Sequence, residues 1–249
     1  MPTLLEESRL STLTFAGRRE SAQSTRFDQL QRVREPVRRS KVGVQGKVAD
    51  VVHGRSRHAE SQNELRAFQI LMATARADLW QEQPFTLEYH HEGKKRRYTP
   101  DLLVRWGARQ EVVEIKEDRD AELAENRDRF ALIANLLAAH NYTFRIWRKS
   151  EICAEPRLTN SNLILRYRCI AVATAEREKI RRAFSSITEW PVYKLSTISE
   201  VPVQNVLRLV LEGAIHIDWW RPLGLESVIS LAPVGRQVWP CASKETSCP

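Results

Sequence analysis

Three residues near the middle of the chain combine two carboxylates with a lysine at a spacing suited to phosphodiester hydrolysis. Asp101 follows Pro100, and after twelve further residues comes Glu114-Ile115-Lys116. Two converging carboxylates repel one another unless a cation lies between them, and hard oxygen ligands of this kind suit Mg²⁺ or Mn²⁺. A cation and a nearby ammonium would stabilise the charge that develops when water attacks a phosphate. The pattern therefore predicts a metal-dependent hydrolytic site.

The surrounding sequence predicts the strands that would position these residues. Residues 82–117 alternate as strands do and contain turns at Gly93 and Gly107, so we expect a compact meander of three strands. Asp101 would lie in the second strand and Glu114 near the end of the third. Antiparallel neighbours joined by a short turn would bring the two carboxylates side by side.

Glu114 and Lys116 are two residues apart, so they project from the same face of a strand. Ile115 points the other way, into the core, while its backbone carbonyl faces the same metal. A charged pair among apolar neighbours is costly to bury without a purpose. The alternative is a solvated strand face that carries an ordinary surface ion pair.

A helix upstream offers a third carboxylate. Ser61 is suited to cap it, with Glu64 three residues later as in a capping box. Glu64 then serves either as a third ligand or as the cap alone, and Glu60 replaces it if the helix begins before Ser61. One apolar stripe supports this helix: Leu65, Phe68, Leu71 and Met72.

Downstream, residues 118–142 predict one long amphipathic helix and residues 143–149 a further strand. A strand, a helix and a strand in this order predict a crossover, so the sheet is expected to be mixed. The fold class is therefore α/β, a mixed sheet flanked by helices. The apolar positions that predict the helix over residues 118–142 are Leu123, Phe130, Ile133, Leu136 and Leu137.

Changes in composition and in the predicted elements divide the chain into three parts. Residues 1–45 are rich in Arg, Ser and Gln and predict a basic N-terminal arm, extended or disordered. Residues 46–152 hold the proposed site. Residues 153–249 predict short helices followed by a small β-hairpin, a smaller and mainly helical domain of winged-helix-like form.

The charge favours a polyanionic partner. The net charge is +8 and the isoelectric point is about 9.6. One basic cluster spans residues 17–57, where the pairs Arg18-Arg19 and Arg38-Arg39 either guide DNA or belong to a solvated tail. A second cluster directly precedes the proposed site and is expected to contact DNA phosphates: Lys94, Lys95, Arg96 and Arg97.

Other features exclude some classes of protein. No run of 18 apolar residues exists, so a membrane span is not expected. The N-terminus lacks the apolar stretch of a secretory signal. The four cysteines have no zinc-like spacing with the six histidines, so reduced cysteines are expected. A cytoplasmic protein is the resulting expectation.

Taken in order, the motifs resemble a known family. They are SxxE (Ser61 to Glu64), QP (Gln83-Pro84), YTPD (Tyr98 to Asp101) and EIK (Glu114 to Lys116). This order is similar to that of the TnsA-like endonuclease subunit of heteromeric, cut-and-paste bacterial transposases, within the PD-(D/E)XK nuclease superfamily. The resemblance spans about residues 40–170.

The resemblance implies a restriction-endonuclease-like fold in which Glu64, Asp101 and Glu114 form the acidic set and Lys116 is the catalytic lysine. It implies magnesium as cofactor, with manganese as a substitute. Its substrate would be double-stranded DNA, cut at the 5′ ends of a transposon, while an integrase-like transposase subunit processes the 3′ ends. The C-terminal domain, residues 153–249, would contact an AAA-type ATPase regulator and DNA. A standalone restriction or repair nuclease and a non-catalytic basic DNA-binding assembly protein are the alternatives.

Overall fold

The computed structural model describes residues 11–16, 31–33, 46–50, 55–74, 80–106 and 109–231. They fall into two units. The described residues of unit 1 lie within Met1–Ala49, Ser56–Leu65 and Asp78–Ser150, and those of unit 2 within Asp50–Arg55, Arg66–Ala77 and Glu151–Pro249. The predicted boundary at residue 152 thus has a counterpart at Ser150, whereas Arg66–Ala77, which the sequence placed in the first domain, group with unit 2. Within the described ranges no helix has the length and apolarity needed to span a membrane.

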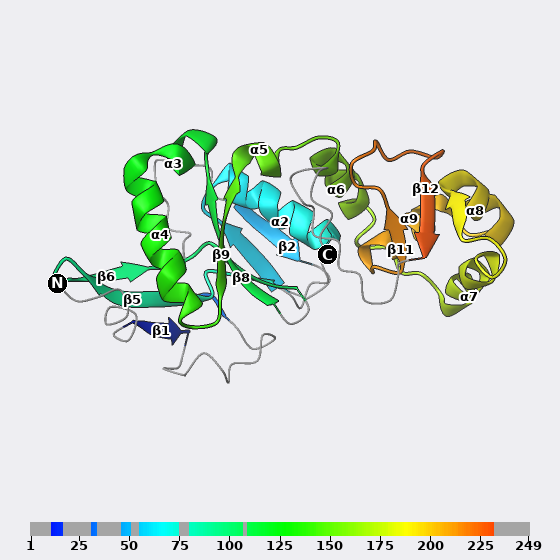
Figure 1. The fold of residues 1–249 in the computed structure, drawn as a ribbon. Helices are drawn as coiled ribbons and strands as arrows, with labels where there is room; N and C mark the ends of the chain where they lie inside the picture. The colour runs from blue at the N-terminus through cyan, green and yellow to red at the C-terminus, as the bar shows by residue number, and fades with distance from the viewer. Residues whose placement is uncertain are drawn as a thin grey trace. The chain divides into compact units, whose positions relative to one another are not determined.

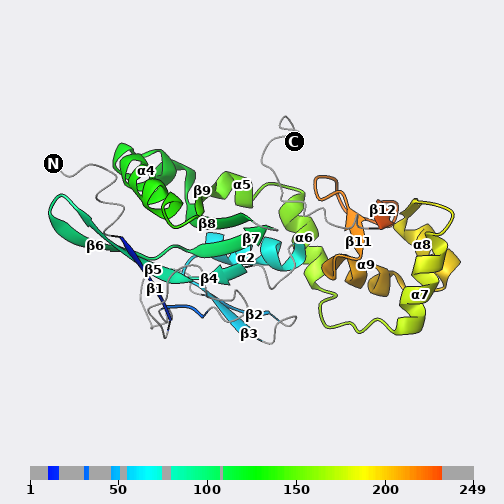
Figure 2. The same cartoon turned by 60° about the horizontal axis from the view of Figure 1, so that its bottom comes forward.

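A four-stranded mixed sheet forms the centre of unit 1 (Figures 1 and 2). The outer strand β4 pairs antiparallel with β7, β7 pairs antiparallel with β8, and β8 pairs parallel with β9. The parallel pair is the crossover that the sequence predicted, and the prediction of a mixed α/β fold is confirmed. In the order of the sheet, the strands are β4 (Trp80–Glu82), β7 (Leu102–Trp106), β8 (Arg109–Lys116) and β9 (Thr143–Arg148).

A second, antiparallel sheet has the order β1-β5-β6, with strands β1 (Thr12–Phe15), β5 (Phe85–His91) and β6 (Lys94–Tyr98). The predicted three-stranded meander is therefore wrong, because β6 and β7 belong to different sheets. Between them lies Pro100, which has no N–H to donate to a strand ladder and so favours a break at this point.

Strand β1 falls in the segment that the sequence assigned to a basic arm. It pairs with β5 and buries Leu13 and Phe15. These side chains join a core that also contains Phe85 from β5 and, from the helix Ala124–Ala138, Ile133 and Leu136. Four residues of the predicted arm are thus part of the fold of unit 1. Arg18, Arg19, Arg38 and Arg39 lie outside the described residues.

The predicted single helix over residues 118–142 is wrong in one respect, because two helices form: α3 (Asp118–Glu122) and α4 (Ala124–Ala138). Leu123 between them has an extended backbone (φ −59°, ψ 132°) and is 40% exposed. Helix α4 packs against β9, as both views show. The break turns α4 so that one of its faces lines the site described below.

A buried charged pair joins β3 (Arg55–Ala59), which pairs with β2 (Gly46–Asp50), to strand β4 of the main sheet. Arg57 is 1% exposed and its Nη1 lies 2.8 Å from Oε2 of buried Glu82. The guanidinium of Arg57 also stacks on Trp80, at 4.1 Å from the ring centroid. This arrangement satisfies a charge that would otherwise be expensive to bury.

Unit 2 combines short helices with an antiparallel sheet of order β10-β12-β11. Asn160 holds the turn after β11, because its side-chain amide donates to the carbonyls of Trp219 and Arg221 and its Oδ1 accepts from the N–H of Leu223. Sequence patterns predicted three of the helices and β11. The elements are α6 (Arg157–Leu165), α7 (Thr174–Ala183), β10 (Glu189–Pro191), α8 (Val192–Ser199), α9 (Val203–Leu211), β11 (Ile215–Ile217) and β12 (Val228–Leu231).

Candidate active site

The end of β8 is open on one side. Strand β7 pairs with β8 only as far as Leu102 opposite Val113, whereas β9 continues along β8 to Lys116. In place of a strand, the carboxylate of Asp101 lies beside this edge, and its Oδ2 accepts a hydrogen bond of 2.6 Å from the backbone N–H of Ile115. The break at Pro100 thus leaves room for a carboxylate where a ladder would otherwise continue.

Glu114 is buried at this edge and is held by two partners. Its Oε1 lies 2.8 Å from Nζ of Lys116, and its Oε2 accepts a hydrogen bond of 2.6 Å from the hydroxyl of Tyr98. Burial and the negative charge of Glu114 hold the pKa of Tyr98 well above its usual value. The hydroxyl therefore stays protonated and donates the hydrogen bond to Glu114. The two side chains that the sequence placed on one strand face do meet.

Electrostatics connect three carboxylates. Loss of hydration, reinforced by the charges of Glu114 and Glu64, holds the pKa of Asp101 well above its usual range. Burial opposes the charge of Lys116, but the carboxylate of Glu114 outweighs it, and the pKa of Lys116 is raised. Such mutual repulsion is the signature of a site that gains from a bound cation.

Glu64 lies in the first turn of helix α2 (Gln62–Thr74). Its Oε2 accepts from the N–H of Glu60 at 2.8 Å and its Oε1 from the hydroxyl of Ser61 at 2.9 Å, while the Ser61 oxygen accepts from the N–H of Glu64 at 3.1 Å. Burial raises the pKa of Glu64, although these two donors act in the opposite direction. The prediction that Glu64 caps the helix is therefore confirmed. Glu64 also lines the cavity described below, and its role as a third ligand stays a prediction.

Glu60 precedes the helix and has a different partner. Its Oε1 accepts a hydrogen bond of 2.9 Å from the side-chain amide of Gln83. Gln83 has a left-handed backbone (φ 42°), and its N–H donates to the carbonyl of Asp101 at 3.0 Å. Gln83 therefore links the segment before α2 to the segment that carries Asp101, a link that no local sequence pattern predicted.

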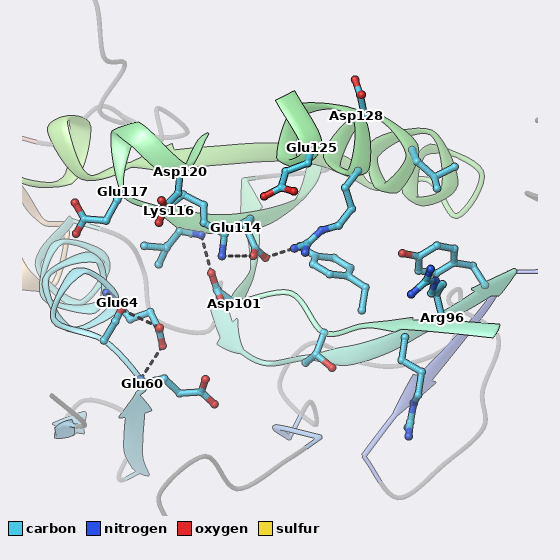
Figure 3. A pocket seen from close by; sticks show the side chains of 18 of the residues that line it. Glu60, Glu64, Arg96, Asp101, Glu114, Lys116, Glu117, Asp120, Glu125 and Asp128 are labelled. Atoms are coloured by element: carbon cyan, nitrogen blue, oxygen red, sulfur yellow. Dashed lines mark hydrogen bonds and ion pairs between the residues drawn. The ribbon is translucent and has the colours of Figure 1, made fainter. Parts of the chain in front are cut away.

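A single polar cavity of about 1120 Å³ contains Glu64, Asp101, Glu114 and Lys116 (Figure 3). Glu60 also lines it, and so does Tyr98. Further acidic residues line it from the α3–α4 side: Glu117, Asp120, Glu125 and Asp128. The cavity thus brings together every side chain proposed for catalysis.

The predicted basic run divides between the two faces of β6. Lys95 and Arg97 both pair with Glu88, at 2.9 and 3.2 Å. Arg96 alternates with them and shares the face of Tyr98. Arg96 and Arg97 line the cavity, whereas Lys94 and Lys95 do not.

Sequence reasoning did not assign a role to two residues of the cavity. Tyr98 counted as an apolar strand position, although its place in the YTPD motif, two residues before Pro100, was the available signal. Arg129 shares one face of α4 with Glu125, Asp128 and Leu132, which line the same cavity. Their spacing of three and four residues was visible in the sequence, but the direction of that face was not.

The donor set fits a hard divalent cation. Asp101, Glu114 and Glu64 offer carboxylate oxygens. Across the described ranges, no three His, Cys, Asp or Glu side chains already converge as a metal site. The carboxylates of this site have other partners instead. Glu64 caps its helix, and Glu114 contacts Tyr98 and Lys116.

We expect Tyr98→Phe to weaken the site by releasing Glu114. A hydrogen bond to a charged group contributes about 1.5–3 kcal/mol, so the free energy of unfolding should fall by about that amount. Because one oxygen of Glu114 is no longer held, half-maximal protection against thermal unfolding by Mn²⁺ should require a higher metal concentration. Thermal melts over a Mn²⁺ titration measure both effects.

Tyr142→Phe is the matched control, because Tyr142 belongs to the same core and has no recorded contact with the carboxylates. Equal Mn²⁺ dependence in the two variants and the wild type would show that Tyr98 does not position Glu114.

One comparison with known proteins gives a match. Residues 77–149 match the family model described as TnsA-like endonuclease N terminal. The match confirms the resemblance seen in the motifs, and this part of the chain is similar to the N-terminal domain of TnsA-like endonucleases. It includes Asp101, Glu114 and Lys116 but begins after Glu64. No curated protein matches the chain.

Proposed function

We propose that this protein is a metal-dependent DNA endonuclease that cuts the 5′ ends of a transposon as the TnsA-like subunit of a heteromeric transposase. The observation that carries the proposal is the convergence of Asp101, Glu114 and Lys116 at the open end of β8, inside a domain of that family. Its substrate is double-stranded DNA, which the positive net charge favours.

Asp101, Glu114 and Glu64 would hold Mg²⁺, for which Mn²⁺ would substitute, together with the backbone carbonyl of Ile115. The N–H and C=O of a strand residue point to the same side, so the Ile115 carbonyl faces the edge at which its N–H meets Asp101. The bound cation would neutralise charge on the phosphate and lower the pKa of a water molecule. For Glu64 to join, its carboxylate must leave the N–H of Glu60.

The chain's own groups then have separate roles. Lys116, charged because of Glu114, places an ammonium beside the attacked phosphate and stabilises its developing negative charge. Tyr98 fixes the direction of Glu114 through its hydroxyl. Asp101 is fixed by the N–H of Ile115, so little rearrangement remains for the reaction itself.

The remaining proposals concern partners. An integrase-like transposase subunit would process the 3′ ends. The part of the chain after residue 153, with short helices and the sheet β10-β12-β11, is proposed as a winged-helix-like domain that contacts DNA and an AAA-type ATPase regulator. The family match supports these partner proposals only through residues 77–149, because it does not extend to the part of the chain after residue 153.

Lys116→Met should slow cleavage about 10²–10⁴-fold, the usual effect of losing a group that stabilises transition-state charge. The assay is single-turnover cleavage of transposon-end DNA with Mg²⁺ or Mn²⁺ and the partner proteins supplied. Chelation of the metal should abolish the wild-type reaction. Lys179→Met is the control, because Lys179 is an exposed lysine that pairs with Glu200 in unit 2.

Equal cleavage by wild type and Lys116→Met would refute the assigned chemistry. Cleavage by the chain alone at sites unrelated to transposon ends would instead favour a restriction or repair nuclease. Binding of DNA without cleavage under every condition would favour the non-catalytic assembly protein.

A further inference from the structure

The cavity carries charges of both signs in separate places. The carboxylates of Asp101 and Glu114 occupy its centre, and Figure 3 shows Glu64 on one side of Asp101 and Arg96 on the other. Arg96 enters from β6, while Arg129 enters from α4. Carboxylates and guanidinium groups thus line one cavity, and different elements carry them.

Arg96 and Arg129 act on the same neighbour. Both arginines line the same cavity as Tyr89. Burial raises the pKa of Tyr89, and the charges of Arg129 and Arg96 both reduce that shift. Tyr89 is the register partner of Arg96 across the β5–β6 pair. The charge of Arg129 also reaches Tyr98 and Lys116, so this subsite adjoins the proposed catalytic centre.

Neither guanidinium is neutralised by a carboxylate within the described ranges, in contrast to Lys95 and Arg97, which share Glu88. Arg129 instead lies against the ring of Phe130, with 4.9 Å between its guanidinium carbon and the ring centroid. Guanidinium groups match the geometry of phosphate oxygens and bind them in bidentate fashion. The pair is therefore suited to hold an anion.

We propose that Arg96 and Arg129 form a subsite for one backbone phosphate of the cut DNA strand, adjacent to the scissile phosphate. The inference rests on the proposed nuclease function for the identity of its ligand. On the α3–α4 side, Asp120 and Glu125 repel a polyanion, so the strand approaches along β6. Contacts of this kind fix the position of the strand without reading its sequence.

The test uses the full chain and a fluorescent duplex of about 30 base pairs that contains a transposon end. Its affinity is measured by anisotropy in EDTA, where no cleavage occurs. Arg129→Ala should weaken binding about tenfold and lower the slope of log affinity against log salt by about one, as expected when one phosphate contact is lost. Arg129→Lys should recover part of the affinity, because it keeps the charge but not the bidentate geometry.

Arg127→Ala is the matched control, since Arg127 is an exposed arginine on α4 that does not line the cavity. It makes the same change of net charge and should remain within about twofold of wild type. A second arm places one uncharged methylphosphonate beside the cut linkage. This linkage should slow cleavage by wild type and have little further effect on Arg129→Ala.

Each outcome decides the proposal. A loss of DNA affinity in Arg129→Ala that Arg127→Ala does not share supports the subsite. If, in addition, no variant and no wild-type protein cleaves DNA, the nuclease function fails and the phosphate subsite remains. Equal losses in the two variants would indicate a general charge effect and overturn the proposal. Wild-type affinity in Arg129→Ala would overturn it too, and so would a wild-type chain that binds no DNA.

Discussion

Asp101→Asn should abolish most of the cleavage activity and at the same time make the protein more stable. The amide keeps an oxygen that accepts from the N–H of Ile115 but removes a negative charge from beside Glu114 and Glu64. Loss of a proposed metal ligand should slow cleavage at least about 10³-fold. Removal of the like-charge repulsion should raise the free energy of unfolding at pH 7 by about 0.5–2 kcal/mol.

The gain in stability should depend on pH in a defined direction. Burial and the negative charges of Glu114 and Glu64 hold the folded-state pKa of Asp101 well above its usual value, so the folded state binds the proton more tightly than the unfolded state does. The stability that Asp101 contributes to the wild type is therefore fully present below about pH 4 and declines as pH rises through the folded pKa. Denaturation midpoints of the two proteins should coincide at low pH and diverge above it.

Asp118→Asn supplies a control of opposite sign. A hydrogen bond from Ser150 lowers the pKa of Asp118, so its contribution to stability is present above the unfolded pKa and is lost as pH falls through the folded pKa. This variant should be slightly less stable than wild type at pH 7. If Asp101→Asn were also less stable at pH 7, the proposed repulsion between the carboxylates would be wrong.

Arg57→Met should lower the free energy of unfolding by about 3–5 kcal/mol, the usual cost of removing one partner of a buried ion pair. Among the described residues, Glu82 would then keep the amide of Gln81 at 3.1 Å and the guanidinium of Arg32 at 3.9 Å. Its carboxylate is buried, so water cannot replace the lost partner. The stacking of the guanidinium on Trp80 would be lost too. Urea denaturation measures the change.

Two further variants distinguish the loss of the buried ion pair from a general loss of stability. Arg57→Met with Glu82→Leu should be more stable than Arg57→Met alone, because no unpaired charge stays buried. Arg148→Met removes an exposed ion pair with Glu122 and should cost less than about 1 kcal/mol. If Arg57→Met cost no more than Arg148→Met, the buried pair would not stabilise unit 1.

Local sequence signals predicted the features that depend on short distances along the chain. The period of two placed Glu114 and Lys116 on one face, where they form an ion pair. Ser61 indicated the start of α2, which begins one residue later. The crossover from β8 to β9 followed from the order of strand, helix and strand.

Features that depend on distant partners were not predicted. Strand alternation continues through residues 94–106 whether or not the strands share a sheet, so only Pro100 hinted that β6 and β7 separate. Strand β1 has four residues, too few for a pattern, and its partner β5 lies far along the chain. Leu123 fits the apolar period of a helix, yet its backbone is extended.

Arg96 and Tyr98 lie two residues apart on β6, a short strand held along its length by β5. Because they share one stretch of paired backbone, we expect a restraint on the guanidinium to reduce the thermal motion of the phenol, and with it the motion of the Glu114 carboxylate that the phenol binds. Capture of a nucleic-acid strand at Arg96, in the middle of β6, would thus lower the entropy that Glu114 must lose when a cation binds. Substrate and cation would then bind with positive cooperativity through the three residues from Arg96 to Tyr98.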